Sequence, residues 1–95
     1  MLPQSQTAIE EPVTTIFVDG QRCEVFIRTE PDLDGTWHNV LLFRRGGRVQ
    51  SRDFIATGLD WHVTPDLALL HAGRLSEAEL KVLLERALRT RPPLA

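Results

Sequence analysis

The sequence predicts an α+β domain in which a four-stranded antiparallel β-meander precedes a short helix and a longer C-terminal amphipathic helix, packed on one face of the sheet. Two observations predict this class. Four runs of β-branched and aromatic residues come first, separated by turn residues, and all helix signals follow them. A chain of 95 residues has room for one small core. We expect a flexible N-terminal arm over 1–12, one domain over 13–91 and a C-terminal tail over 92–95.

The first two predicted strands, 13–19 and 21–29, form a hairpin. Both runs are rich in the β-branched and aromatic side chains that strands favour. Asp19 and Gly20 stand between them. This dipeptide suits a type I′ turn, because both central residues of that turn need a positive φ.

The next two strands are predicted over 37–45 and 48–56. A loop containing Pro31 and the turn dipeptide Asp34–Gly35 precedes them. Gly46–Gly47 separates them and predicts a second tight turn. Because every connection is short, each strand is expected to pair with the one before it, which makes the sheet an antiparallel meander.

The short helix is predicted to begin after Thr64 and to end at Gly73. Thr64 is a favourable N-cap residue, and Pro65 fits the first helical position because its missing N–H is not needed there. Glycine is typical of the position where a helix ends.

The long helix begins at a capping box formed by Ser76 and Glu79. In this motif the serine caps a backbone N–H of the first turn, while the glutamate reaches back to the backbone of the serine. Apolar residues then recur at helical spacing on one side: Leu80, Leu83, Leu84, Ala87 and Leu88. Pro92–Pro93 stops the helix.

Composition excludes several classes of protein. The chain carries 11 basic and 13 acidic residues and a net charge of −2, whereas a dedicated nucleic-acid binder is usually strongly basic. Its one cysteine, Cys23, excludes an internal disulfide and a cysteine-cluster zinc site. The sequence shows no signal peptide and no apolar run of about 18 residues. We therefore expect a cytoplasmic protein with no membrane partner.

No constellation for catalysis is evident. His38, His62 and His71 lack the spacing of a metal site, and Cys23 is expected to be a buried strand residue. Trp61 is expected to close the end of the core. The sequence therefore predicts no enzymatic activity and no catalytic, cofactor-binding or metal-binding residues.

The two faces of the predicted sheet differ in chemistry. Alternation within each strand places an aliphatic set on one face, which is expected to lie beneath the long helix. The other face combines phenylalanine with arginine and is the candidate interaction surface: Arg22, Phe26, Arg28, Phe43, Arg45, Arg48, Arg52 and Phe54. Two other arrangements stay open. A register slip of one residue exchanges the faces, and the phenylalanines then form the core beneath the helix. Alternatively, the phenylalanines are exposed and close a homodimer.

Two functions follow from this surface. The first is a small non-enzymatic interaction module that binds a protein partner or a second copy of itself through its sheet. The alternative is single-stranded nucleic-acid binding, in which phenylalanines stack on bases and arginines pair with phosphates. At the level of topology alone, a meander followed by a helix resembles single-strand-binding coactivator and Whirly-type domains. That resemblance implies a fold and not a function.

Overall fold

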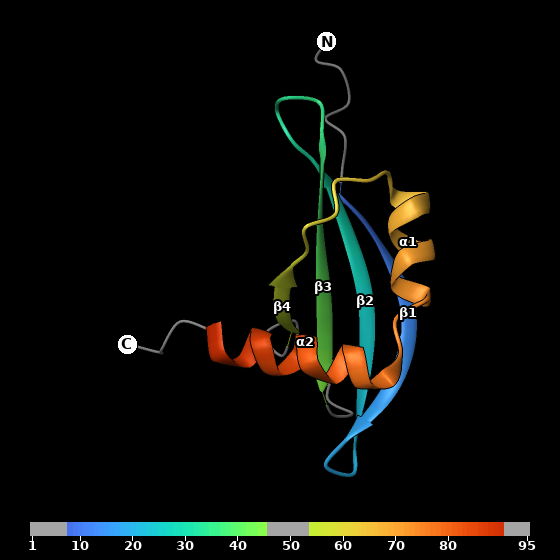
Figure 1. Cartoon of the computed structure of the whole chain (residues 1–95), viewed down its shortest axis with the longest axis vertical. Coiled ribbons are helices and arrows are strands. Elements are labelled where there is room, and N and C mark those ends of the chain that lie inside the picture. The colour runs from blue at the N-terminus through green and yellow to red at the C-terminus, as the bar shows by residue number, and fades with distance from the viewer. Residues whose placement is uncertain (1–7, 46–53, 91–95) are drawn as a thin grey trace.

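The computed structural model describes residues 8–45 and 54–90. It confirms the α+β class, with four antiparallel strands followed by two helices (Figure 1). The elements are β1 (Ile9–Val18), β2 (Gln21–Pro31), β3 (Trp37–Arg45), β4 (Phe54–Gly58), α1 (Pro65–Gly73) and α2 (Glu77–Thr90).

The β1–β2 hairpin has the turn that its sequence predicts. Asp19 has a φ of 52° and Gly20 a φ of 78°, so both central residues lie in the left-handed region that a type I′ turn requires. The register therefore pairs Val18 with Gln21. Strand β1 begins at Ile9 and so extends into the segment that the sequence assigned to an N-terminal arm.

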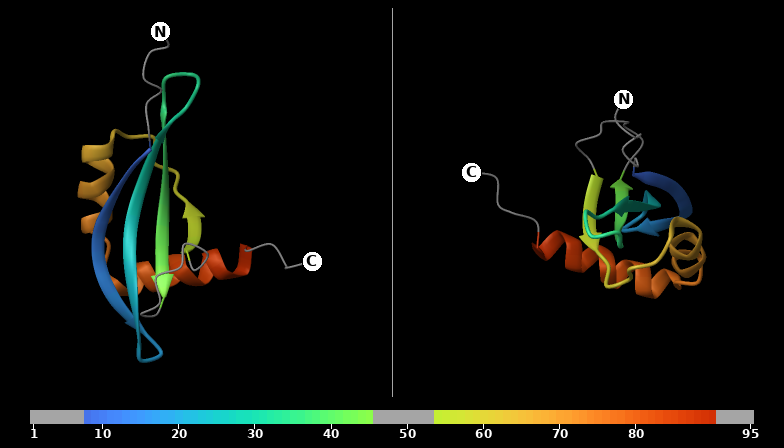
Figure 2. Two further views of the ribbon diagram at one scale, coloured as in Figure 1. Left: turned by 180° about the vertical axis from the view of Figure 1, so that it is seen from behind. Right: turned by 90° about the horizontal axis from the view of Figure 1, so that it is seen from above.

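The sheet has the order β1-β2-β3-β4, which is the predicted meander. Both helices lie on the same side of it. Seen from behind, the strands lie in front of the helices, and the view from above shows the sheet with both helices on one side (Figure 2). One face of the sheet is therefore covered by helices, and we call the opposite one the outer face.

The helix-covered face forms the core. Strand β2 buries every second residue, and β3 supplies the largest fully buried side chain, Phe43, with 0% exposure. Leu80 and Leu84 of α2 pack onto this layer at 2% exposure each. Of the predicted stripe, Leu80, Leu84 and Ala87 face the sheet, Leu83 is partly buried, and Leu88 is 38% exposed. Removal of the buried part from water stabilises the fold.

The capping box at the start of α2 is confirmed. The backbone N–H of Ser76 donates to Glu79 Oε1 at 2.9 Å, and the Glu79 N–H donates to Ser76 Oγ at 3.1 Å. The pKa of the Glu79 carboxyl is lowered, because the backbone N–H of Ser76 and then the Ser76 side chain both favour its charged form. Helix α1 has the predicted bounds, although the side chain of its N-cap residue Thr64 makes no capping bond.

One polar pair lies inside the core. Thr29 and Asn39 are paired across β2 and β3 with 1% and 0% exposure, and Thr29 Oγ1 donates to Asn39 Oδ1 at 2.6 Å. The Asn39 amide donates to the carbonyl oxygens of Trp61 and Val63 at 2.9 and 3.2 Å. Asn39 therefore ties the connection between β4 and α1 to the middle of the sheet.

The register between β3 and β4 corrects the prediction for the second hairpin. Arg44 is opposite Phe54. A two-residue turn at Gly46–Gly47 does not give that pairing, because it would set Arg44 opposite Val49. The described part of β4 runs from Phe54 to Gly58, two residues beyond the predicted end at 56. Residues 46–53 lie outside the described part of the chain. Within the described ranges, no helix is long and apolar enough to span a membrane.

Candidate interaction surface

The outer face is built by alternate residues of the strands. Since successive strand side chains point to opposite faces, the neighbours of each buried core residue point away from the helices. Strand β2 contributes Arg22, Glu24, Phe26, Arg28 and Glu30, and β3 contributes His38, Val40, Leu42 and Arg44. Phe17 of β1 and Ala56 of β4 flank them.

The centre of this face is apolar. Phe26 is partly exposed and lies opposite Leu42, which in turn lies opposite Ala56. Leu42 is 7% exposed, whereas Phe17, at the edge of the sheet, is 59% exposed. Among the described side chains the apolar part of this face is therefore a narrow strip, not the broad phenylalanine patch that the sequence predicted.

Ion pairs border the strip. Arg44 Nη2 lies 2.6 Å from Glu24 Oε1, and the Arg44 guanidinium carbon lies 5.5 Å from the centre of the Phe26 ring. Both partners of this pair are less than one-third exposed, so the bridge is screened less than an ordinary surface pair. On the other side of Phe26, Arg28 Nε lies 3.0 Å from Glu30 Oε1. These two arginines therefore each have a carboxylate partner.

The structure brings three of the predicted surface residues together. Arg22, Phe26 and Arg28 lie on the outer face as alternate residues of β2. Phe54 is the residue opposite Arg44 in β4, but its side chain is not among those described. Arg48 and Arg52 lie outside the described residues.

The placement of Phe43 and Arg45 on this surface is wrong. Phe43 is paired with Val25, and Arg45 with Cys23, both buried residues of the helix-covered face. The strand bounds are right, but the face assigned to each residue of β3 is reversed, because a shift of one residue exchanges the two faces. Arg44 and Leu42 take these two places, and the sequence carries no local signal that distinguishes the two registers.

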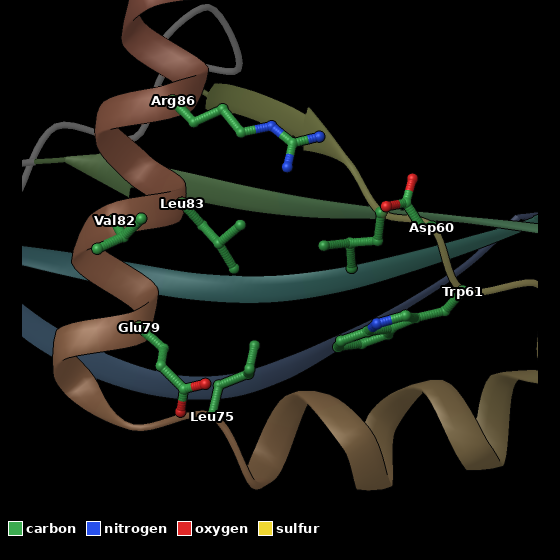
Figure 3. A pocket seen from close by; sticks show the side chains of 8 residues that line it. Asp60, Trp61, Leu75, Glu79, Val82, Leu83 and Arg86 are labelled. Carbon is green, nitrogen blue, oxygen red and sulfur yellow. The ribbon is translucent and has the colours of Figure 1, made fainter.

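A pocket of about 360 Å³ lies at the other side of the molecule, between α2 and the segment that follows β4 (Figure 3). Its apolar lining includes Trp61, Leu75 and Leu83, which also pack against the core, so Trp61 has its predicted position. Two of the charged groups in its lining, Glu79 and Arg86, already make bonds within the fold. Glu79 belongs to the capping box, and Arg86 Nη2 donates to the Gly58 carbonyl at 3.4 Å.

Two further titratable groups, Cys23 and Asp34, have structural roles. Cys23 is fully buried, and burial raises the pKa of its thiol, so the nucleophilic thiolate is disfavoured. In the loop between β2 and β3, the hydroxyl and N–H of Thr36 donate to Asp34 Oδ1 and lower the pKa of that carboxyl. Within residues 8–45 and 54–90, no three His, Cys, Asp or Glu side chains are grouped to hold a metal ion.

Comparison with known proteins adds no relative. No protein-family model, curated protein or solved structure matches the chain.

Proposed function

We propose that this domain is a non-enzymatic interaction module that binds a protein on the outer face of its sheet. The observation that carries the proposal is the chemistry of that face, where arginines already paired with glutamates border the partly exposed ring of Phe26. Arginine and aromatic residues are enriched at protein interfaces, where they supply contact area and fixed hydrogen-bond geometry. The small core gives a second reason, since a domain of this size gains stability from burying further surface.

Single-stranded nucleic acid is the second candidate, and one contact favours it. The Arg44 guanidinium beside Phe26 combines a cation with a stacking surface. However, Glu24 and Glu30 lie within 3.0 Å of the arginines that would bind phosphate, so a phosphate group there meets two carboxylates. The net charge of −2 opposes the same encounter. A protein partner fits this mixed charge better.

The edges of the sheet are less suited to binding than its outer face. At the β1 edge, the register shifts between Pro12 and Thr14, and the exposed side chains of Glu10 and Glu11 precede this irregularity. Proline, charge and a bulge are features that prevent a strand from adding to an edge. The other edge strand, β4, comprises 5 residues in the described part of the chain.

Site-specific cross-linking tests the proposal. A photoreactive phenylalanine analogue is placed at Phe26, and at Leu33 as the control, because Leu33 is fully exposed in the loop between β2 and β3. In an extract of the cells that make the protein, we expect position 26 to give protein adducts and position 33 to give few. Excess wild-type chain is expected to compete these adducts away, and Arg28→Glu to compete poorly.

Two results contradict this proposal. One is equal cross-linking from both positions, which removes the outer face as a specific surface. The other is an adduct that nuclease digests, together with salt-sensitive binding of a labelled single-stranded oligonucleotide at low ionic strength. That result would identify the outer face as a binding surface for single-stranded nucleic acid instead of protein.

A further inference from the structure

The charge order along β2 identifies a partner for the outer face. We infer that the partner is a second copy of this chain, packed face to face with its β2 antiparallel to the first and with the two-fold axis at Phe26. This inference rests on the proposed function, since it names the protein that the outer face binds.

The alternate residues of β2 are self-complementary about Phe26. In chain order they are Arg22, Glu24, Phe26, Arg28 and Glu30. A two-fold axis at Phe26 reverses this order in the second copy. Glu24 then faces Arg28 of the other copy, Arg22 faces Glu30 of the other copy, and the Phe26 rings meet at the centre. All four resulting charge contacts between the two β2 strands are attractive. The same surface can therefore bind a second copy of itself, which is the requirement for an isologous interface.

The geometry of packed sheets shows which contacts matter most. Packed sheets lie about 10 Å apart with strands crossing at about 30°. Glu24 and Arg28 each lie about 7 Å from Phe26 along the strand. At that distance from the axis, the crossing angle displaces the two strands sideways by only about 4 Å. Arg22 and Glu30 are twice as far from the axis. The Glu24–Arg28 contact is therefore expected to determine pairing, and the outer contact to add less.

The bonds within each copy leave capacity for these contacts. Arg44 binds Oε1 of Glu24, and a carboxylate has a second oxygen that accepts hydrogen bonds. Glu30 binds Nε of Arg28, and a guanidinium has further donors on its two other nitrogens. Each intramolecular pair therefore holds its side chain in place while it accepts a partner from the second copy.

The size of the face is typical of a weak, reversible interface. Strand β3 has 9 residues, which is a length of about 30 Å, and four strands span about 20 Å. The face thus offers about 600 Å² to each partner, somewhat below the roughly 800 Å² of a standard interface. We expect a reversible dimer with a dissociation constant in the micromolar range.

Paired charge reversals test the inference. Glu24→Arg places like charges opposite Arg28, and Arg28→Glu places like charges opposite Glu24. By symmetry each variant creates two repulsive contacts, and we expect each to weaken self-association about tenfold or more. An equimolar mixture restores both contacts with attractive charges, so the two variants are expected to form a heterodimer. Sedimentation velocity and native mass spectrometry measure these species.

Matched controls separate the specific contact from net charge and from folding. Glu85→Arg and Arg89→Glu make the same changes of charge at exposed positions of α2, in the helix layer. They are expected to leave self-association unchanged, alone and mixed. The double variant Glu24→Arg/Arg28→Glu retains the self-complementary order but loses the pairs with Arg44 and Glu30, so it is expected to dimerise more tightly than either single variant and less tightly than wild type. Circular dichroism verifies that each variant is folded.

The outcomes distinguish the two proposals. A wild-type chain that stays monomeric up to high micromolar concentration overturns the second-copy partner, and cross-linking of Phe26 to another protein then still supports the interaction module. A wild-type dimer that neither charge reversal affects places the self-contact elsewhere and overturns the second copy as the partner of the outer face, while cross-linking at Phe26 still decides the interaction module. Heterodimer formation only from the Glu24→Arg and Arg28→Glu mixture supports both.

Discussion

The two faces of the same four strands have opposite chemistry. On the helix-covered face, Phe43, Leu41 and Ile27 are removed from water almost completely. On the outer face, the neighbouring residues of the same strands alternate in charge around Phe26. The helix-covered layer of side chains therefore supplies most of the burial that stabilises this small domain. Changes on the other face are therefore expected to alter association more than folding.

Phe43 and Phe26 lie on opposite faces of the sheet, and their substitution is expected to give the greatest difference in the free energy of unfolding. Phe43→Ala removes a fully buried ring from the core and is expected to lower the free energy of unfolding by about 3–5 kcal/mol. Phe26→Ala, on the outer face, is expected to cost less than about 1 kcal/mol in the monomer. Urea denaturation at low protein concentration measures both. Equal losses would show that the outer face is also core.

Helix α2 allows a comparison within one element. Leu84→Ala is expected to cost roughly 2–5 kcal/mol, because Leu84 is 2% exposed against the sheet. Val82→Ala on the same helix is the control, with 60% exposure and an expected change within about 0.5 kcal/mol. Thermal or urea unfolding of both variants is the measurement. A loss well under 1 kcal/mol for Leu84→Ala would contradict the orientation of the helix.

The buried polar pair gives the next effect. Asn39→Ala leaves the Thr29 hydroxyl and the carbonyl oxygens of Trp61 and Val63 without their present partner. We expect a loss of about 1–3 kcal/mol, since water can satisfy some of these groups near the surface. Amide hydrogen exchange is expected to accelerate between β4 and α1 more than in β2. Uniform acceleration would mean that Asn39 does not hold this connection.

The smallest effect is a pH dependence at the capping box. The pKa of Glu79 is lowered in the folded protein, so its charge stabilises the fold above the ordinary glutamate pKa of about 4.3. This contribution is lost as the pH falls through the lower, folded-state value. Glu79→Gln is therefore expected to be less stable than wild type near neutral pH and to approach it in acid. A stability difference that stays constant from pH 7 to pH 3 would contradict this role.

Local signals in the sequence predicted their elements well. The Asp19–Gly20 turn, the bounds of α1 and the Ser76–Glu79 capping box each depend on residues within a few positions, and the structure has all three. The bounds of β3 were also predictable, because its run of strand-forming residues is continuous.

Long-range pairing was the part that the sequence did not determine. The face of Phe43 depends on a one-residue choice of register, which no nearby residue specifies. The outer face therefore carries Arg22, Phe26 and Arg28, as the predicted faces require, whereas Phe43 and Arg45 lie on the helix-covered face. The burial of Asn39 was not predictable either, since its partners Trp61 and Val63 come from a segment far along the chain.

The most direct test of the contrast between the faces uses the four phenylalanines of the chain as probes. Fluorine-labelled phenylalanine gives one ¹⁹F resonance for each, assigned by single substitution, and the protein is diluted from high to low micromolar concentration. We expect the Phe26 resonance to shift with concentration and the Phe43 resonance to stay constant. A Phe43 resonance that shifts while that of Phe26 does not would contradict the assignment of the outer face as the interaction surface.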